Sequence, residues 1–190
     1  MGFRIAGEFA VQHGIALDRE DLGGVFGRGQ VRCASADAES AANLDVGVLL
    51  PLTYMNLSGD AVAEALAELP IEDPVRDLLV VVDDVDLPFG RLRVRGRGGA
   101  GGQRGLAHVI ERLGRQDFPR LRFGIGRPDG GYETADHVLQ GFSDAEEKAL
   151  PAHVTRAVDA VTKALCEGAE AAMDAFNRDP EASPGEAGDP

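Results

Sequence analysis

The strongest constraint in this 190-residue sequence is an unbroken apolar run, LLVVV over residues 78–82, followed at once by Asp83 and Asp84. Five apolar residues in a row, three of them β-branched valines, are typical of a strand buried on both faces. Such strands belong to sheets that are covered by helices. The run therefore predicts an α/β fold with two carboxylates at the end of a buried strand.

The rest of the sequence alternates helical and extended patterns. Apolar spacing predicts helices over residues 2–13, 56–68 and 106–113, and strands over residues 29–34, 46–50, 90–95 and 121–125. Ser143 and Glu146 form a capping-box pattern, which predicts a helical segment that extends to Phe176. Pro151 lies inside this segment and is expected to interrupt it early.

Length and composition are those of one globular domain. Hydrophobic residues make up 44% of the chain and charged residues 27%, which excludes a largely disordered protein. We predict a single α/β domain over residues 1–178, with a mixed, mostly parallel sheet flanked by helices. Residues 179–190, DPEASPGEAGDP, are predicted to form a disordered acidic tail.

Several features indicate a soluble cytoplasmic protein. No apolar run reaches the roughly 18 residues of a membrane helix, and no signal-peptide pattern opens the sequence. Cys33 and Cys166 are too few for a disulfide framework and suit a reducing compartment.

Positive charge is concentrated in one segment of an acidic chain. The formal net charge is −13, yet residues 91–127 contain ten arginines and only two acidic residues, Glu111 and Asp117. A basic block on an acidic body can bind a polyanion such as RNA on one face. The same block can equally be an ordinary solvated surface, so charge alone leaves both interpretations open.

Three segments, in this order and spacing, resemble the bacterial peptidyl-tRNA hydrolase family. Residues 51–59, PLTYMNLSG, are similar to the family pattern KPxTYMNxSG, and residues 83–90, DDVDLPFG, to HDDLDLPxG. Residues 98–128 are similar to GGxGGHNGL followed by DFxRLRxGIGRP. The resemblance covers roughly residues 2 to 178 and is far more specific than a lone glycine motif.

The resemblance implies hydrolysis of the ester that joins a peptide to the 3′ ribose of tRNA. In the family a His acts as general base on a water molecule, a neighbouring Asp orients that His, and Asn amides hold the terminal adenosine and the carbonyl. It implies peptidyl-tRNA as the partner, a monomeric state, and no metal or other cofactor.

Individual positions take roles from the same resemblance. Asp83 matches the Asp that orients the His, and Tyr54, Asn56 and Arg104 match positions at the tRNA 3′ end. Judged from the residue types alone, Asn56 fits a helix N-cap and Tyr54 a packing residue.

Two further arginines and the glycine-rich loop also match the family. Arg95 and Arg122 match basic positions that meet tRNA phosphate, a group that arginine binds bidentately. The loop at residues 98–102 resembles the family's mobile loop over the site, although an ordinary flexible linker has the same composition.

The sequence departs from the family in two places. Met1-Gly2-Phe3 aligns with the end of the family loop RHNVGF, so the first strand, GLGNPG, and the catalytic His have no counterpart in this sequence. Gln103-Arg104 stands where the family has His-Asn. Four other histidines are present, none at the catalytic position: His13, His108, His137 and His153.

Two explanations of these departures stay open. Either the start of the protein lies upstream of Met1, or the chain is a non-catalytic relative that binds tRNA or another RNA. The sequence by itself predicts little or no hydrolysis of peptidyl-tRNA, because the general base is missing from it.

Overall fold

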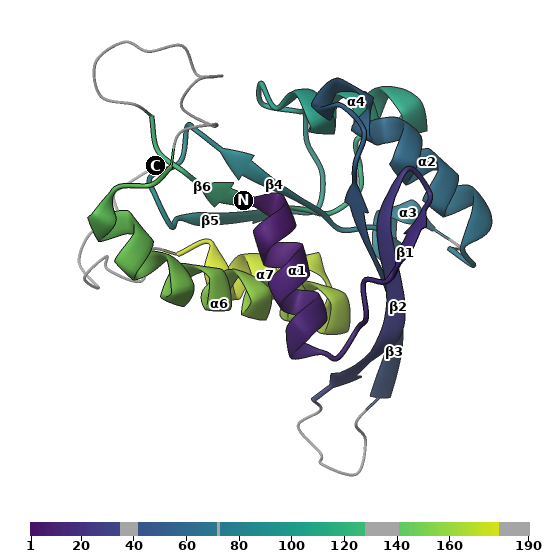
Figure 1. The fold of residues 1–190 in the computed structure, drawn as a ribbon, viewed down its shortest axis with the longest axis horizontal. Coiled ribbons are helices and arrows are strands. Elements are labelled where there is room, and N and C mark those ends of the chain that lie inside the picture. Colours follow the sequence, from purple (N-terminus) through teal and green to yellow (C-terminus); the bar gives the residue numbers. More distant parts are fainter. Residues whose placement is uncertain (35–41, 72, 128–140, 179–190) are drawn as a thin grey trace.

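The computed structural model describes residues 1–34, 42–71, 73–127 and 141–178, and these form two three-stranded sheets with helices around them (Figure 1). This confirms the predicted α/β class. The disordered tail predicted for residues 179–190 lies outside the described residues.

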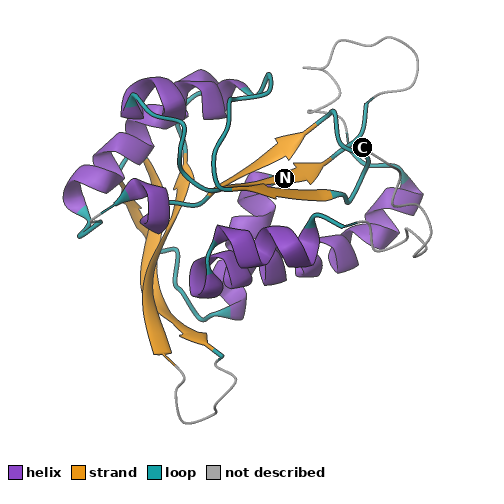
Figure 2. Ribbon diagram, turned by 180° about the vertical axis from the view of Figure 1, so that it is seen from behind, coloured by secondary structure: helices purple, strands orange, loops and turns teal. Residues whose placement is uncertain are grey.

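The first sheet is an antiparallel meander. It contains β1 (Arg19–Asp21), β2 (Gly24–Cys33) and β3 (Ala42–Pro51), in that order. The long β2–β3 ribbon extends away from the rest of the molecule in Figure 2. Its inner residues, Val31, Val46 and Val48, are buried against the main core.

The second sheet carries the apolar run that dominates the sequence. Its order is β4 (Val80–Asp84), β6 (Arg120–Gly124), β5 (Leu92–Arg95), with β4 and β6 parallel and β5 and β6 antiparallel. This sheet is mixed, as predicted, with one parallel and one antiparallel pair of strands. When the described strands of both sheets are taken together, antiparallel pairs outnumber the parallel pair, so the expected mostly parallel arrangement is not found.

Helices cover both faces of the second sheet. The helical elements are α1 (Gly2–Gln12), the 3₁₀ helix η2 (Met55–Leu57), α2 (Ser58–Glu68), α3 (Pro74–Asp77), α4 (Arg104–Leu113), α6 (Asp144–Glu167) and α7 (Ala169–Phe176). Figure 1 shows α6 and α7 below the sheet, α4 and α2 above it, and α1 crossing near the end of β4.

Alternation along β6 divides the core into two parts. Leu121 and Phe123 belong to the main core with α1, α6 and α7. Val82, on the opposite face, packs with Leu106 and Val109 of α4 in a smaller cluster. Because successive side chains in a strand point to opposite faces, Arg120 and Arg122 lie on the same side as α4.

The outer edge of β5 is closed by a side chain. Asn177 Oδ1 accepts a hydrogen bond from the Val94 amide at 2.7 Å, and Asn177 Nδ2 donates to the Val94 carbonyl at 3.0 Å. The amide side chain thereby satisfies backbone groups that an edge strand would otherwise expose.

Pro151 does not interrupt its helix, so that expectation is wrong. The capping box of Ser143 and Glu146 is present, and α6 continues from Asp144 through Pro151 to Glu167. A proline removes one bond to the carbonyl four residues earlier. Both Pro151 and Glu147 are exposed, so water can satisfy that carbonyl while the opposite face of α6 stays packed.

The two cysteines are joined, so the expectation of reduced thiols from their small number is wrong. Cys33 at the end of β2 forms a disulfide with Cys166 near the end of α6, across 133 residues of sequence. In a separate observation, no helix among the described residues is both long and apolar enough to cross a bilayer.

Candidate functional site

The 3₁₀ helix η2 packs against the start of α4. A Cβ on Gly105 would lie 2.7 Å from the Met55 sulfur and 3.3 Å from the Met55 carbonyl oxygen, so a larger residue here would require the Met55 side chain to move. Gln103 caps α4 by accepting a hydrogen bond from the Leu106 amide at 2.6 Å. Its Nε2 lies 3.5 Å from the Met55 sulfur.

This contact brings two of the predicted site residues into one region. Asn56 follows Met55, and Arg104 follows Gln103 as the first residue of α4. Both side chains are exposed. The sequence alternative for Asn56, a helix N-cap, is not what the structure shows, because α2 begins after Leu57 and has no side-chain cap.

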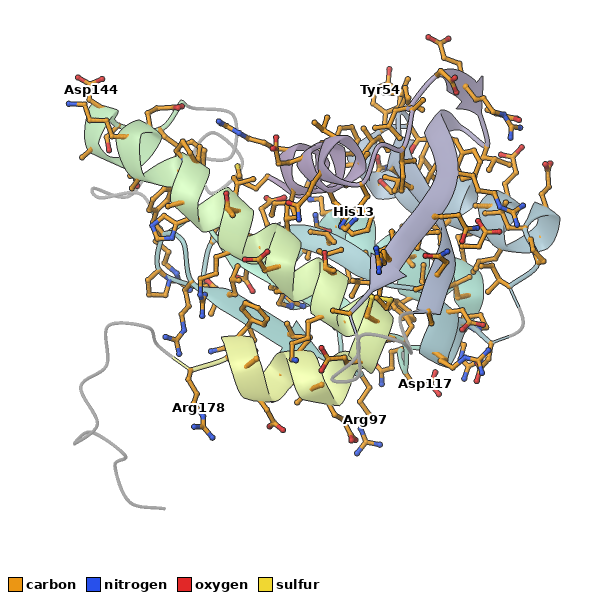
Figure 3. The ribbon with its side chains drawn as sticks, turned by 90° about the horizontal axis from the view of Figure 1, so that it is seen from below. His13, Tyr54, Arg97, Asp117, Asp144 and Arg178 are labelled. Atoms are coloured by element: carbon orange, nitrogen blue, oxygen red, sulfur yellow. A yellow bond between two sulfur atoms is a disulfide. The ribbon has the colours of Figure 1, made fainter. Side chains whose placement is uncertain are left out.

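Tyr54 lies at the outer edge of the same region. Its side chain is 81% exposed, and Figure 3 shows it projecting from the surface of the molecule. Such exposure argues against a packing role for this ring. Three neighbouring apolar side chains are also exposed, namely Leu52, Met55 and Leu57.

Asp83 and Asp84 point to opposite faces at the carboxyl end of β4. Asp83 is partly buried, and its Oδ1 lies 3.9 Å from the backbone nitrogen of Met1 at the start of α1. Asp84 Oδ2 accepts a hydrogen bond from Arg122 Nη1 at 3.0 Å, and its Oδ1 accepts one from the Asp86 amide at 2.9 Å. The second bond caps the turn that follows β4, a common role for an aspartate.

The arginines of residues 91–127 do not form one basic surface. Arg120 and Arg122 are buried, and Arg122 forms an ion pair with Asp84. Three others pair with carboxylates at the surface: Arg112 with Asp60, Arg115 with Asp117, and Arg127 with Asp86. Arg93 and Arg95 are exposed on β5, on the face opposite Leu92 and Val94.

Arg95 therefore lies where a phosphate could reach it, and Arg122 does not. In the strand register Arg95 stands opposite Arg120, while Arg93 stands opposite Arg122. Arg122 has a relative exposure of only 8% and donates to Asp84 and to the carbonyls of Gly99 and Ala100. The predicted phosphate contact of Arg122 does not fit this interior position.

The three described histidines are engaged away from Asp83. His13 Nε2 lies 3.2 Å from the Thr162 hydroxyl, and His108 Nδ1 accepts a hydrogen bond from the Gly59 amide at 3.0 Å. His153 packs edge-on against Phe89. His137 lies outside the described residues. His13, His108 and His153 therefore take part in contacts within the fold, and none of the three faces Asp83 in these contacts.

The described residues contain no group of three or more His, Cys, Asp or Glu side chains arranged to hold a metal ion.

Sequence reasoning missed three structural residues of this region: Gln103, Asp84 as a charge partner, and Arg120. The sequence did hold one usable signal for the arginines. In RLRFG, residues 120–124, arginines alternate with apolar residues within a strand. If the apolar residues of that strand face the core, the arginines must point to the opposite face of the sheet. The glycine-rich loop could then cover the arginines on that face.

Comparison with known proteins agrees with this arrangement. The family model described as peptidyl-tRNA hydrolase matches residues 1–184. The peptidyl-tRNA hydrolase of Chloroflexus aggregans is 41% identical over 177 residues, which cover 93% of this chain and 88% of the relative. That of Symbiobacterium thermophilum is 44% identical over 176 residues, with the same two coverages.

Solved structures give the same result. A peptidyl-tRNA hydrolase crystallised with n-propanol superposes with a TM-score of 0.81 at 29% identity, covering 95% of this chain and 86% of the other. The enzyme from Acinetobacter baumannii superposes with a TM-score of 0.79 at 29% identity, covering 92% of this chain and 83% of the other. With a family model across nearly its whole length and relatives above 40% identity, the chain belongs to the peptidyl-tRNA hydrolase family.

Proposed function

We propose that the chain binds peptidyl-tRNA with the tRNA 3′ end at η2 and the start of α4, and that the bond it acts on is the peptidyl ester. The observation that carries this proposal is the close contact of Met55 with Gln103 and Gly105. Asn56 is the neighbour of Met55 in sequence and Arg104 lies between Gln103 and Gly105, so the contact supports a shared surface region that Tyr54 borders.

Each of the three side chains offers a different interaction to an RNA 3′ end. The Tyr54 ring can stack on an unpaired base, a contact that every base can make. The Asn56 amide both donates and accepts hydrogen bonds, which suits an adenosine edge or a carbonyl. Arg104 donates only, so it suits a phosphate and does not replace the amide that the family has at this position.

Asp83 is proposed to orient the general base. In the family pattern RHNVGF the His precedes the position of Met1 by two residues. The Met1 nitrogen lies 3.9 Å from Asp83, so a chain segment entering α1 passes directly beside this carboxylate. A carboxylate in this position fixes the tautomer and the ring orientation of an imidazole that activates water.

Arg95 is proposed to contact a phosphate farther along the acceptor stem. Arg95 lies on β5, two strands across the sheet from Asp83 on β4. On the central strand β6, Arg95 is opposite Arg120 and Asp83 is opposite Phe123, so the two positions differ by three residues along the strand direction. The spacing of strands and residues puts the two Cα atoms roughly 14 Å apart. Because the two side chains also point to opposite faces of the sheet, only an extended ligand that passes around the end of the sheet contacts both, as the acceptor end of tRNA can. We further expect a monomeric, cytoplasmic protein, since peptidyl-tRNA arises where translation occurs.

A second candidate function is RNA binding without hydrolysis. It is supported by Arg104 in place of the family amide, and by the three described histidines being engaged away from Asp83.

Binding is tested with a minihelix that reproduces the tRNA acceptor stem and its single-stranded 3′ end. The affinity should fall steeply as salt rises. Tyr54→Ala should weaken binding of this RNA by roughly tenfold, the usual scale of a lost base stack, whereas Tyr54→Phe should retain it. Salt-insensitive or absent binding by the folded protein would overturn both candidate functions.

Hydrolysis is tested in parallel by release of an N-acetylated amino acid from its tRNA. If the protein is a hydrolase, Asp83→Asn should lower the rate of ester hydrolysis by about a hundredfold, the low end of general-base effects. Its affinity for the minihelix should be unchanged. A rate no higher than that in buffer, measured with the protein isolated from its own cells and with binding intact, assigns the chain to the second function.

A further inference from the structure

Arg122 lies beneath the glycine-rich loop and binds it directly. Its Nη2 donates to the carbonyl of Gly99 at 3.0 Å and to the carbonyl of Ala100 at 2.8 Å. A Cβ on Gly101 would lie 2.8 Å from Arg122 Nη1, and Gly101 has a φ of +56°, which favours glycine. The loop thus wraps closely around the guanidinium.

The other end of the same guanidinium is attached to β4. Arg122 Nη1 donates to Asp84 Oδ2 at 3.0 Å, and the two side chains are only 10% and 8% exposed. Breaking a buried pair by removing one partner is strongly destabilising, because the remaining charge stays buried. Arg122 therefore joins the strand end that carries Asp83 to the loop that leads into α4.

Arg120 strengthens the attachment at the base of the loop. It donates to the carbonyls of Gly98, Phe118 and Gln116, and its guanidinium lies over the Phe118 ring. Burial, and secondarily the nearby charge of Arg122, lower the pKa of Arg120 below its ordinary value. This second cation holds the loop through carbonyl groups rather than through a carboxylate.

We propose that Arg122 is a positioning residue, which with Asp84 fixes the glycine-rich loop and hence the start of α4 at the tRNA site. The inference rests on the proposed function for what the loop serves, but the attachment itself is a property of the free protein. It gives Arg122 a role different from the phosphate contact that the sequence suggested.

Amide hydrogen exchange tests the attachment without any RNA. Gly98 donates its amide to the Gln116 carbonyl, and Gln103 donates its amide to the Ala100 carbonyl, so both amides report on loop closure. In Arg122→Met their exchange should accelerate at least about tenfold, while the amides of the β4–β6 ladder keep their protection. Arg122→Lys should restore part of the effect, since an ammonium can still pair with Asp84.

Asp84→Asn provides an independent route should Arg122→Met fail to fold. It keeps the shape of the side chain and removes the charge partner, and should accelerate exchange at the same two amides. Arg95→Met is the matched control, because it removes an exposed cation from the same face of the sheet, and among the described residues this side chain forms no hydrogen bond with the loop. Its loop amides should exchange as in the wild type.

The salt dependence of minihelix affinity then shows whether Arg122 positions the loop or contacts a phosphate itself. Arg95→Met should reduce the slope of log affinity against log salt by about 0.9, the value for one phosphate contact on a duplex. Arg122→Met should leave the slope unchanged and weaken only minihelices that carry the single-stranded 3′ end.

Unchanged loop exchange in both Arg122→Met and Asp84→Asn would overturn the proposal, and so would a slope in Arg122→Met that falls as in Arg95→Met. If the wild type binds no minihelix, the proposed function fails, yet the exchange result still decides whether Arg122 holds the loop.

Discussion

At the scale of single residues, arginines of one segment serve different purposes according to what surrounds them. Arg95 keeps its charge in water and is available to a ligand. Arg122 lies in the interior against a carboxylate, and Arg120 lies there against carbonyl groups. A count of charges along the sequence therefore overstates the basic surface, because buried and paired cations contribute little field outside the protein.

Ion pairs at the surface also shift the pKa of their carboxyl groups, and Asp117 is the clearest example. Its hydrogen bond with Arg115 lowers the pKa of the Asp117 carboxyl to about 2, with a smaller contribution from Arg97. Figure 3 shows Arg97 and Asp117 on the same side of the molecule. A carboxyl whose pKa is lowered by folding stabilises the native state above its unfolded pKa, and that contribution disappears as the pH falls from about 4 toward 2.

Carbon-detected NMR titration of the side-chain carboxyl checks this pairing. We expect Asp117 to titrate near pH 2 in the wild type. In Arg115→Gln the pKa should rise toward the ordinary value of 3.8, because the main hydrogen bond is lost. In Arg112→Gln, which removes a surface cation paired with Asp60 instead, Asp117 should be unaffected. A titration near pH 4 in the wild type would contradict the pairing.

At the scale of elements, packing between α2 and α4 depends on one glycine. A Cβ on Gly59 would lie 2.4 Å from the His108 carbonyl oxygen, a backbone atom that cannot move independently. The Gly59 amide also donates to His108 Nδ1. Gly59→Ala should lower the free energy of unfolding by about 2 kcal/mol, because the overpacking cost exceeds the gain in helix propensity.

Urea unfolding measures this effect against a matched helical glycine. Gly7 lies inside α1 with nothing within 4 Å of its Cβ position, so Gly7→Ala should raise stability by about 0.5–1 kcal/mol. A Gly59→Ala protein as stable as Gly7→Ala would show that α2 and α4 can move apart without cost.

The sequence predicted the positions of individual helices and strands well, but it did not predict how they contact one another. Local patterns located α1, β4, β6 and the capping box of Ser143, because each depends on neighbours within a few residues. The contact of η2 with α4 and the burial of Arg122 depend on residues far apart in sequence, which periodicity does not detect. The site positions came from the family resemblance, since Asn56 and Tyr54 alone suggested a cap and a core residue.

At the scale of the whole molecule, the two sheets share no ladder of hydrogen bonds among the described strands, and residues of both belong to the main core. Val31, Val46 and Val48 of the first sheet belong to the same core cluster as Val158 and Val161 of α6. The Cys33–Cys166 disulfide lies at the same junction and closes 133 residues of sequence. Linking residues so far apart restricts the unfolded chain and stabilises the folded one by about 2–4 kcal/mol.

Reduction should therefore lower the melting temperature of the wild-type protein. The double variant Cys33→Ala/Cys166→Ala should melt at the lower temperature whether or not reductant is present, because it has no bond to lose. Mass spectrometry after alkylation of the unfolded, unreduced protein should find both cysteines unlabelled, as the structure has no free thiol among its cysteines. Labelling at both would mean that apolar packing alone joins the ribbon to α6. The melting temperature of the wild type should then be insensitive to reductant, and a loss of stability in the double variant would report only the loss of the half-buried cysteine side chains.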